Sequence, residues 1–170
     1  MPKAIRIYVR YVDAVSRVIG RITMYLIFAM MGILLFGAIS RSFFNVPFIW
    51  VVEMAQFVMT AYYLLGGAYS IQLDSHVRMD LLYGRWSPRT QAIVDAVTGC
   101  FLVFYLIILL YGGISSTQYA LEYGQKNYSV WAPPLAPIKI IMTIGIAMML
   151  LQIIATFFKD LEKAKGEQGE

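Results

Sequence analysis

Four long hydrophobic segments alternate with shorter polar segments along the chain. Each contains an uncharged run of about 18 to 26 residues; the first run lies between Arg21 and Arg41, and the second segment carries an acid, Glu53, near its start. A helix needs about 20 predominantly apolar residues to cross the hydrocarbon core of a membrane. The pattern therefore predicts four transmembrane helices, over approximately residues 22–41, 48–73, 90–121 and 138–158.

The composition agrees with this pattern. Hydrophobic residues make up 59% of the 170-residue chain and charged residues 14%, whereas soluble domains average about 25% charged residues. The mean hydropathy is +0.66. The four segments are apolar nearly all round, rather than polar on one side as in a soluble helical bundle. We therefore expect an all-α integral membrane protein whose membrane domain covers residues 22–158.

The basic residues are unevenly distributed between the two sides that four spans would create. Eleven of the 14 lie before the first segment, between the second and third, or after the fourth. Because basic residues accumulate on the cytoplasmic side of membrane proteins, both termini and the middle loop are predicted to be cytoplasmic. Topology thus accounts for the net charge of +4, and no nucleic-acid partner is implied. The basic residues on the opposite side are Arg41, Lys126 and Lys139.

Residues 1–21 are predicted to form an amphipathic helix that precedes the first span. Asp13 lies three residues after Arg10 and four before Arg17, within reach of both. A cationic helix of this kind lies on the cytoplasmic leaflet and binds membrane lipid, or its apolar face docks on another subunit; the pattern leaves both open. A charged cytoplasmic tail is expected over residues 159–170. The lipid-facing basic stripe consists of Arg6, Arg10, Arg17 and Arg21.

Catalytic and metal-binding patterns are sparse. The chain has one histidine, His76, and one cysteine, Cys100, so it offers neither a paired-histidine haem site nor a thiolate cluster. The glycines form no phosphate-binding pattern, and the hydroxyl run at 115–117 has no histidine near it in sequence. We therefore expect a protein that is not an enzyme and that holds no cofactor or metal of its own.

Glu53 is the most conspicuous single residue, because an acid in a membrane span is a functional candidate. It either carries a proton or a cation, or has a structural role and bonds to Arg41, a loop amide or a partner subunit. No other acid or base lies deep within the spans. A self-sufficient ion-coupled transporter usually needs polar groups or broken helices at the membrane midplane. The chain is therefore interpreted as a scaffold.

Two further groups have a structural and a functional interpretation. His76, Arg78 and Asp80 follow the second span; they either form an acid–base group at the cytoplasmic interface or hold the loop and cap the span ends. Gly66 and Gly67 either allow close approach of another helix or are simply tolerated in a membrane helix.

Several short motifs, taken in order, resemble the small membrane subunit of TRAP transporters, the DctQ-like family. The second span contains Trp50 and Glu53, followed by Leu-Gly-Gly-Ala at 65–68. The likeness covers about residues 20–158, and the combination is more specific than any single motif. The other matching motifs are His76-Val-Arg78-Met-Asp80-Leu81, the outer-loop Trp131-Ala-Pro-Pro134, and Gly145 with Leu151-Gln152.

This resemblance implies the small, non-catalytic subunit of a tripartite, sodium-coupled symporter for organic acids in a bacterial inner membrane. In such a transporter a periplasmic substrate-binding protein captures the substrate, and a large multi-span permease subunit, where sodium is expected, moves it as an elevator. The small subunit holds the scaffold of the large one, and its outer loops, at 41–53 and 122–139, are placed to help dock the binding protein. Candidate structural or partner contacts are Glu53, Gly66, Gly67, His76, Arg78, Asp80, Trp131 and Pro134, with Gly112 and Gly113 as further packing positions.

Two alternatives come from other functional classes. A self-contained four-span, proton-coupled exporter would use Glu53 and would transport without any partner. A quinone- or haem-anchoring subunit of a respiratory complex is disfavoured by the single histidine.

Overall fold

The computed structural model describes residues 3–73 and 88–166, and every long element in these ranges is a helix. The only strand-like pairing among the described residues is one antiparallel bridge between Lys126 and Pro134. The predicted all-α class is confirmed, and each hydrophobic segment forms one helix. The helices are α1 (Lys3–Phe43), α2 (Trp50–Gln72), α4 (Pro88–Glu122) and α5 (Ala136–Gly166).

α1 is longer than we predicted, because it continues for 41 residues without a break. The amphipathic segment 1–21 and the first span, predicted as separate elements, therefore share one helix. No proline occurs within α1, and its glycine at the junction, Gly20, is buried against another helix rather than free to bend. At about 1.5 Å per residue the helix is roughly 60 Å long, whereas the hydrocarbon core is about 30 Å thick. α1 is thus longer than a single crossing requires.

Three of the helices are long and apolar enough to cross a membrane, as judged by length and composition: α1, the Val97–Glu122 part of α4, and the Ala136–Lys159 part of α5. α2 has 23 residues and is not among these three helices, although Glu53 is its one charged residue. It has a neighbouring helix on either side, α1 and α5, so part of its surface packs against protein.

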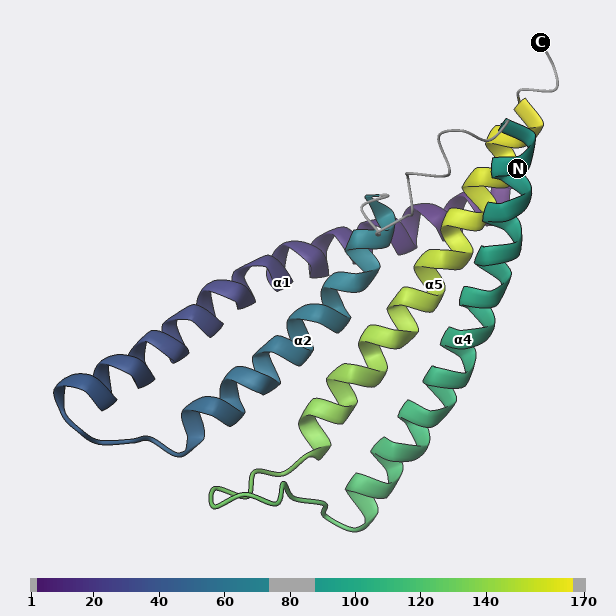
Figure 1. Ribbon diagram of the computed structural model, residues 1–170. Helices are drawn as coiled ribbons and strands as arrows, with labels where there is room; N and C mark the ends of the chain where they lie inside the picture. Colours follow the sequence, from purple (N-terminus) through teal and green to yellow (C-terminus); the bar gives the residue numbers. More distant parts are fainter. Residues whose placement is uncertain (1–2, 74–87, 167–170) are drawn as a thin grey trace.

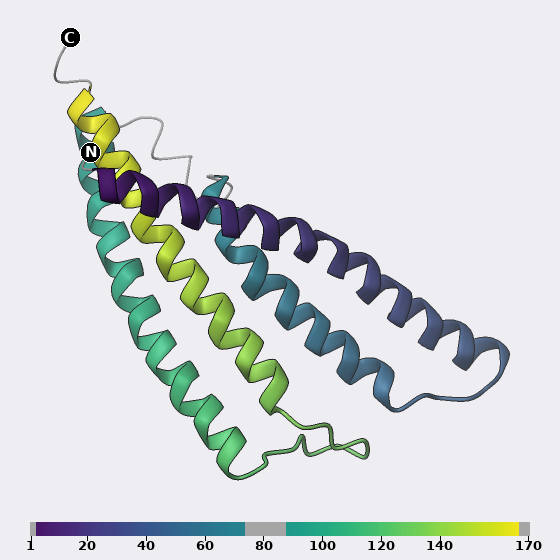
Figure 2. The ribbon, with the colours of Figure 1, turned by 180° about the vertical axis from the view of Figure 1, so that it is seen from behind.

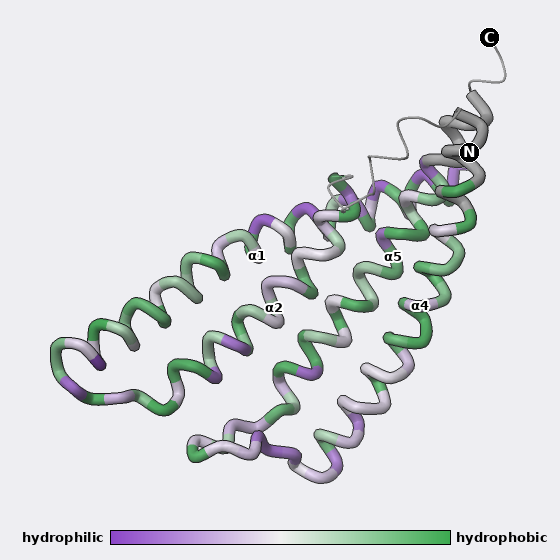
Figure 3. Tube along the Cα trace, in the orientation of Figure 1, coloured by the Kyte–Doolittle hydropathy of each residue, from purple (hydrophilic) through white to green (hydrophobic). Residues whose placement is uncertain are grey.

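The four helices form one open layer in the order α1, α2, α5, α4 (Figures 1 and 2). α2 and α5 occupy the middle, α1 packs mainly on α2, and α4 packs on α5. The helices converge toward the end that holds both chain termini and splay apart toward the α1–α2 and α4–α5 connections. Apolar residues extend along the helices, and polar residues concentrate in the connections and in the first half of α1 (Figure 3).

Small residues allow the two central helices to approach closely. Gly145 of α5 lies directly against the backbone of Leu64 of α2, where an added Cβ would stand 2.9 Å from the carbonyl carbon and oxygen. Backbone atoms cannot move aside as a flexible side chain can. The buried core also includes Leu106 of α4 and Ile146 of α5, which are 1% and 2% exposed. The α2–α5 interface therefore depends on the absence of a side chain at residue 145.

The connection between α4 and α5 is folded rather than extended. Gly124 adopts a left-handed conformation with φ +55°. The main-chain N–H of Gln125 donates to the main-chain carbonyl of Ala120 at 3.1 Å, which is the arrangement of a Schellman helix end. Beyond it, the main-chain N–H of Asn127 donates to the Pro133 carbonyl at 3.0 Å, and the main-chain N–H of Leu135 donates to the main-chain carbonyl of Gln125 at 2.9 Å. These bonds close the connection into a compact loop.

A Gly145→Ala substitution should destabilise the protein, because the new methyl group would push α5 away from the α2 backbone. Overpacking of this kind costs about 1–3 kcal/mol, so we expect a fall in the thermal unfolding midpoint of the detergent-solubilised protein. Gly112→Ala is the matched control, since nothing lies within 4 Å of a Cβ built there. Equal unfolding midpoints for the two variants would contradict the packing described here.

Candidate functional site

A buried group of polar side chains joins α1 to α5 near the end where the chain termini lie. Gln152 of α5 is 0% exposed and Ser16 of α1 is 2% exposed. The Ser16 hydroxyl donates to Gln152 Oε1 at 2.7 Å, and Gln152 Nε2 donates to Asp13 Oδ1 at 2.9 Å. The second Asp13 oxygen accepts a bond from Lys159 Nζ at 2.5 Å. We call Asp13, Ser16, Gln152 and Lys159 the α1–α5 polar cluster.

Two more bonds extend this region along the helices. Gln72, at the end of α2, donates to the Asp13 main-chain carbonyl at 3.2 Å, so all three helices meet here. The Tyr8 hydroxyl donates to the Leu151 carbonyl at 3.1 Å. Tyr8 precedes the uncharged run of α1, and burial raises the pKa of its phenol above the usual value. The Oε1 atom of Gln72 is buried without a partner among the described residues.

The spacing of the residues explains why the polar cluster forms. Asp13 and Ser16 are three residues apart on α1, and Gln152 and Lys159 are seven apart on α5, so each pair shares one helix face. The sequence places Asp13 within reach of Arg10 and Arg17 on its own helix. The structure instead pairs it with Lys159, because the carboxylate faces the helix interface.

A second polar group lies at the opposite end, between α4 and α5. The hydroxyls of Thr117 and Thr143 are 3.0 Å apart, and each lies within hydrogen-bond distance of the Lys139 carbonyl. Lys139 Nζ donates to Gln125 Oε1 at 2.6 Å and thereby ties the α4–α5 connection to α5. These residues were not singled out as contacts from the sequence. In the sequence, these contacts could have been recognised from single polar residues that interrupt apolar runs.

Glu53 lies in the first turn of α2 and is 8% exposed. Its Oε2 atom is buried without a hydrogen-bond partner among the described residues, and no ion pair joins it to Arg41. Among the described residues no second titratable group is bonded to the Glu53 carboxylate.

The glycines that we expected at helix contacts differ in their surroundings. Gly66 of α2 faces the methyl group of Thr23 in α1, and Gly67 faces the side chain of Met149 in α5. Gly113 of α4 faces Thr143 of α5, whereas Gly112 has open space in front of it. The first three thus lie at contacts within the chain.

The other predicted site residues are placed as follows. Trp131 and Pro134 lie in the α4–α5 connection, where Trp131 is 42% exposed and Pro134 pairs with Lys126. His76, Arg78 and Asp80 lie outside the described residues. The basic stripe is exposed throughout, at Arg6, Arg10, Arg17 and Arg21.

Within the described residues no group of three or more His, Cys, Asp or Glu side chains is arranged to hold a metal ion. The polar groups described above join helices to one another, and none of them surrounds a space for a substrate. The arrangement suits a protein whose polar residues hold its helices together.

Comparison with known proteins identifies a family. A family model described as "Tripartite ATP-independent periplasmic transporters, DctQ component" matches residues 30–163. No curated protein matches the chain. The matched range begins inside α1, so the α1 side of the polar cluster lies before it, whereas Gln152 and Lys159 lie within it.

A Gln152→Leu substitution should weaken the contact between α1 and α5. It leaves the Ser16 hydroxyl and one Asp13 oxygen without their partners, and a buried unsatisfied polar group costs about 1–3 kcal/mol. We expect a lower thermal unfolding midpoint in detergent. The matched control is Gln118→Leu, at an exposed position of α4. If both variants unfold at the same temperature, the polar cluster does not hold these helices together.

Proposed function

The chain belongs to the DctQ family, the small membrane component of tripartite ATP-independent periplasmic (TRAP) transporters, and we propose that it serves as the static scaffold of a sodium-coupled organic-acid importer. It is a transporter component and not an enzyme. In this proposal the large permease subunit binds the substrate and sodium, and a periplasmic binding protein delivers the substrate. The small subunit anchors the permease in a bacterial inner membrane.

The observation that carries the scaffold proposal is the open, single-layer arrangement of the helices (Figure 1). Away from the place where α1 crosses α5 (Figure 2), the layer is one helix thick and both of its faces are available. α4 alone exposes Phe101, Phe104, Tyr105 and Tyr111 by more than half. Such a surface is compatible with lipid and with a large hydrophobic partner. It offers no enclosed polar path for a substrate within the described residues.

A scaffold must also keep its shape while its partner moves. An elevator-type transport domain moves relative to a fixed element, and a wider fixed element tilts less in the membrane. The polar cluster and the close α2–α5 contact hold α1, α2 and α5 as one unit. Hydrogen bonds and close packing are the interactions that hold helices together in lipid, where the hydrophobic effect supplies no attraction between them.

The α4–α5 connection is the proposed contact for the binding protein. Its apolar side chains point outward: Tyr128 is 101% exposed and Val130 is 85% exposed. The main-chain bonds that close the loop give this exposed tip a defined shape. In the proposed topology the tip faces the periplasm, because most basic residues lie toward the other side.

Purification of the tagged chain from its own host in a mild detergent should recover a large multi-span permease in about equal amounts, as measured by mass spectrometry. Transport reconstituted in liposomes should require both subunits, and Glu53→Gln should leave uptake close to the unsubstituted rate. A chain recovered alone as a stable homo-oligomer, with transport abolished by Glu53→Gln, would show that the exporter alternative is correct.

The topology has its own test, based on cysteine labelling in a Cys100→Ser background. A membrane-impermeant maleimide should label Tyr128→Cys from the outside of intact cells. Arg6→Cys, also at an exposed position, should be labelled only after the membrane is permeabilised. The reverse pattern would place the termini outside and would contradict the orientation inferred from the basic residues.

A further inference from the structure

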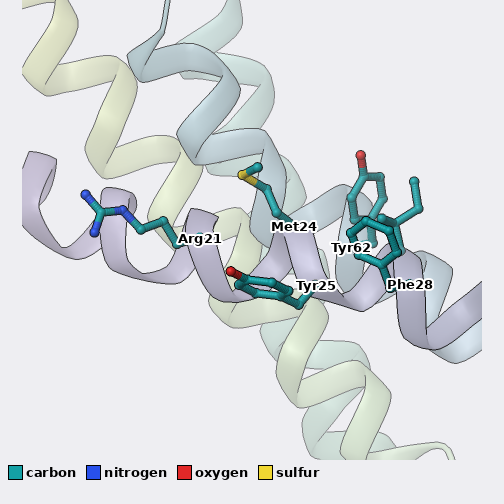
Figure 4. A pocket seen from close by; sticks show the side chains of 6 residues that line it. Arg21, Met24, Tyr25, Phe28 and Tyr62 are labelled. Carbon is teal, nitrogen blue, oxygen red and sulfur yellow. The ribbon is translucent and has the colours of Figure 1, made fainter.

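A groove lies between α1 and α2 at the point where the basic part of α1 changes to its uncharged part. It has a volume of about 370 Å³ and is lined mainly by apolar side chains (Figure 4). Arg21 is the last basic residue before the uncharged run, and it forms one end of the lining. The full lining consists of Arg21, Met24, Tyr25, Ile27, Phe28 and Tyr62.

The two ends of this groove differ in chemistry. At one end the Arg21 side chain extends outward, and the hydroxyl of Tyr25 points toward the same end (Figure 4). Arg21 is exposed and makes no ion pair with a described residue. Away from Arg21, the groove is lined by Phe28 of α1 and Tyr62 of α2. A cation and a hydroxyl thus lie at one end of the groove, and mainly apolar side chains line the rest of it.

We propose that this groove is a binding site for one anionic phospholipid. The phosphate group would pair with the Arg21 guanidinium and accept a bond from the Tyr25 hydroxyl. One acyl chain would lie along Met24 and Phe28 against Tyr62. This assignment combines charge complementarity at one end with apolar contact along the rest.

The size of the groove supports a lipid rather than a protein segment as the occupant. Sites for small ligands have volumes of about 300–1,000 Å³, and this groove, at about 370 Å³, is within that range. Exposed aromatic side chains also suit contact with acyl chains: Phe28 is 66% exposed and Tyr25 is 72% exposed.

A lipid bound in the groove would also stabilise the packing of α1 in the helix layer. α1 is at its edge and packs mainly on α2, so a lipid that contacts both helices would add to that interface. The proposal requires that α1 crosses the membrane, and it does not depend on the substrate or on the identity of the permease.

Lipid binding is measured by native mass spectrometry of the full-length protein, purified with any subunit that accompanies it, and titrated with phosphatidylglycerol or phosphatidylcholine. Phosphatidylglycerol should bind more tightly, and Arg21→Gln should weaken its binding about fivefold, which corresponds to the ~1 kcal/mol that one basic residue contributes near an anionic lipid surface. Arg41→Gln, at the opposite end of α1, should leave binding unchanged. Equal binding of the two lipids, or no effect of Arg21→Gln, would overturn the proposal.

A photocrosslinking experiment identifies the occupant directly. The full chain with p-benzoylphenylalanine in place of Phe28 is irradiated in bilayers containing one part phosphatidylglycerol to four parts phosphatidylcholine. The crosslinked lipid should be enriched in phosphatidylglycerol over the bilayer. The same substitution at Phe101, which is 71% exposed on α4, should show no enrichment of phosphatidylglycerol among its lipid crosslinks. A crosslink to another protein subunit would show that the groove is a subunit contact and would overturn the lipid assignment, while leaving the TRAP-subunit function intact.

Discussion

The contact between Asp13 and Gln152 is the interaction on which the arrangement of this protein depends. It joins the first and last helices through two residues that are 139 positions apart in sequence. Gln152 also bonds to Ser16, and Asp13 also bonds to Lys159. The Lys159 and Asp13 side chains remain 34% and 18% exposed, so their ion pair alone would contribute little. The buried amide contributes more, because displacing it would leave several polar groups unsatisfied in an apolar environment.

The close packing of α2 and α5 has the second largest effect on the architecture. Because Gly145 admits the backbone of Leu64, the last helix packs beside α2, and α4 is left at the edge (Figure 1). An edge helix with large exposed apolar residues is a natural surface for a membrane partner. The open layer and the DctQ match are both consistent with a membrane component of a transporter.

Several expectations from the sequence depended on local rules, and these were the reliable ones. The helices could be predicted because backbone groups in lipid must bond within their own segment. The uncharged runs gave the place of each helix but not its full length, since α1 begins at Lys3 and α5 continues to Gly166, into the predicted charged tail. The family resemblance could also be recognised from short motifs, and the match over residues 30–163 agrees with it. The continuity of α1 was missed, since a change from an amphipathic to an apolar pattern does not itself break a helix, and nothing at Gly20 bends this one.

The sequence by itself determined the class of the protein and the place of the four hydrophobic helices along the chain, because both follow from composition and periodicity along one segment. Only the tertiary structure decided which helices are neighbours, that Asp13 bonds across to α5 rather than along α1, and that Glu53 is buried without a partner among the described residues. The physical reason is that the same apolar side chains suit lipid and a neighbouring helix equally well. Neighbours are then selected by a few glycines and hydrogen bonds whose partners lie far away in the chain.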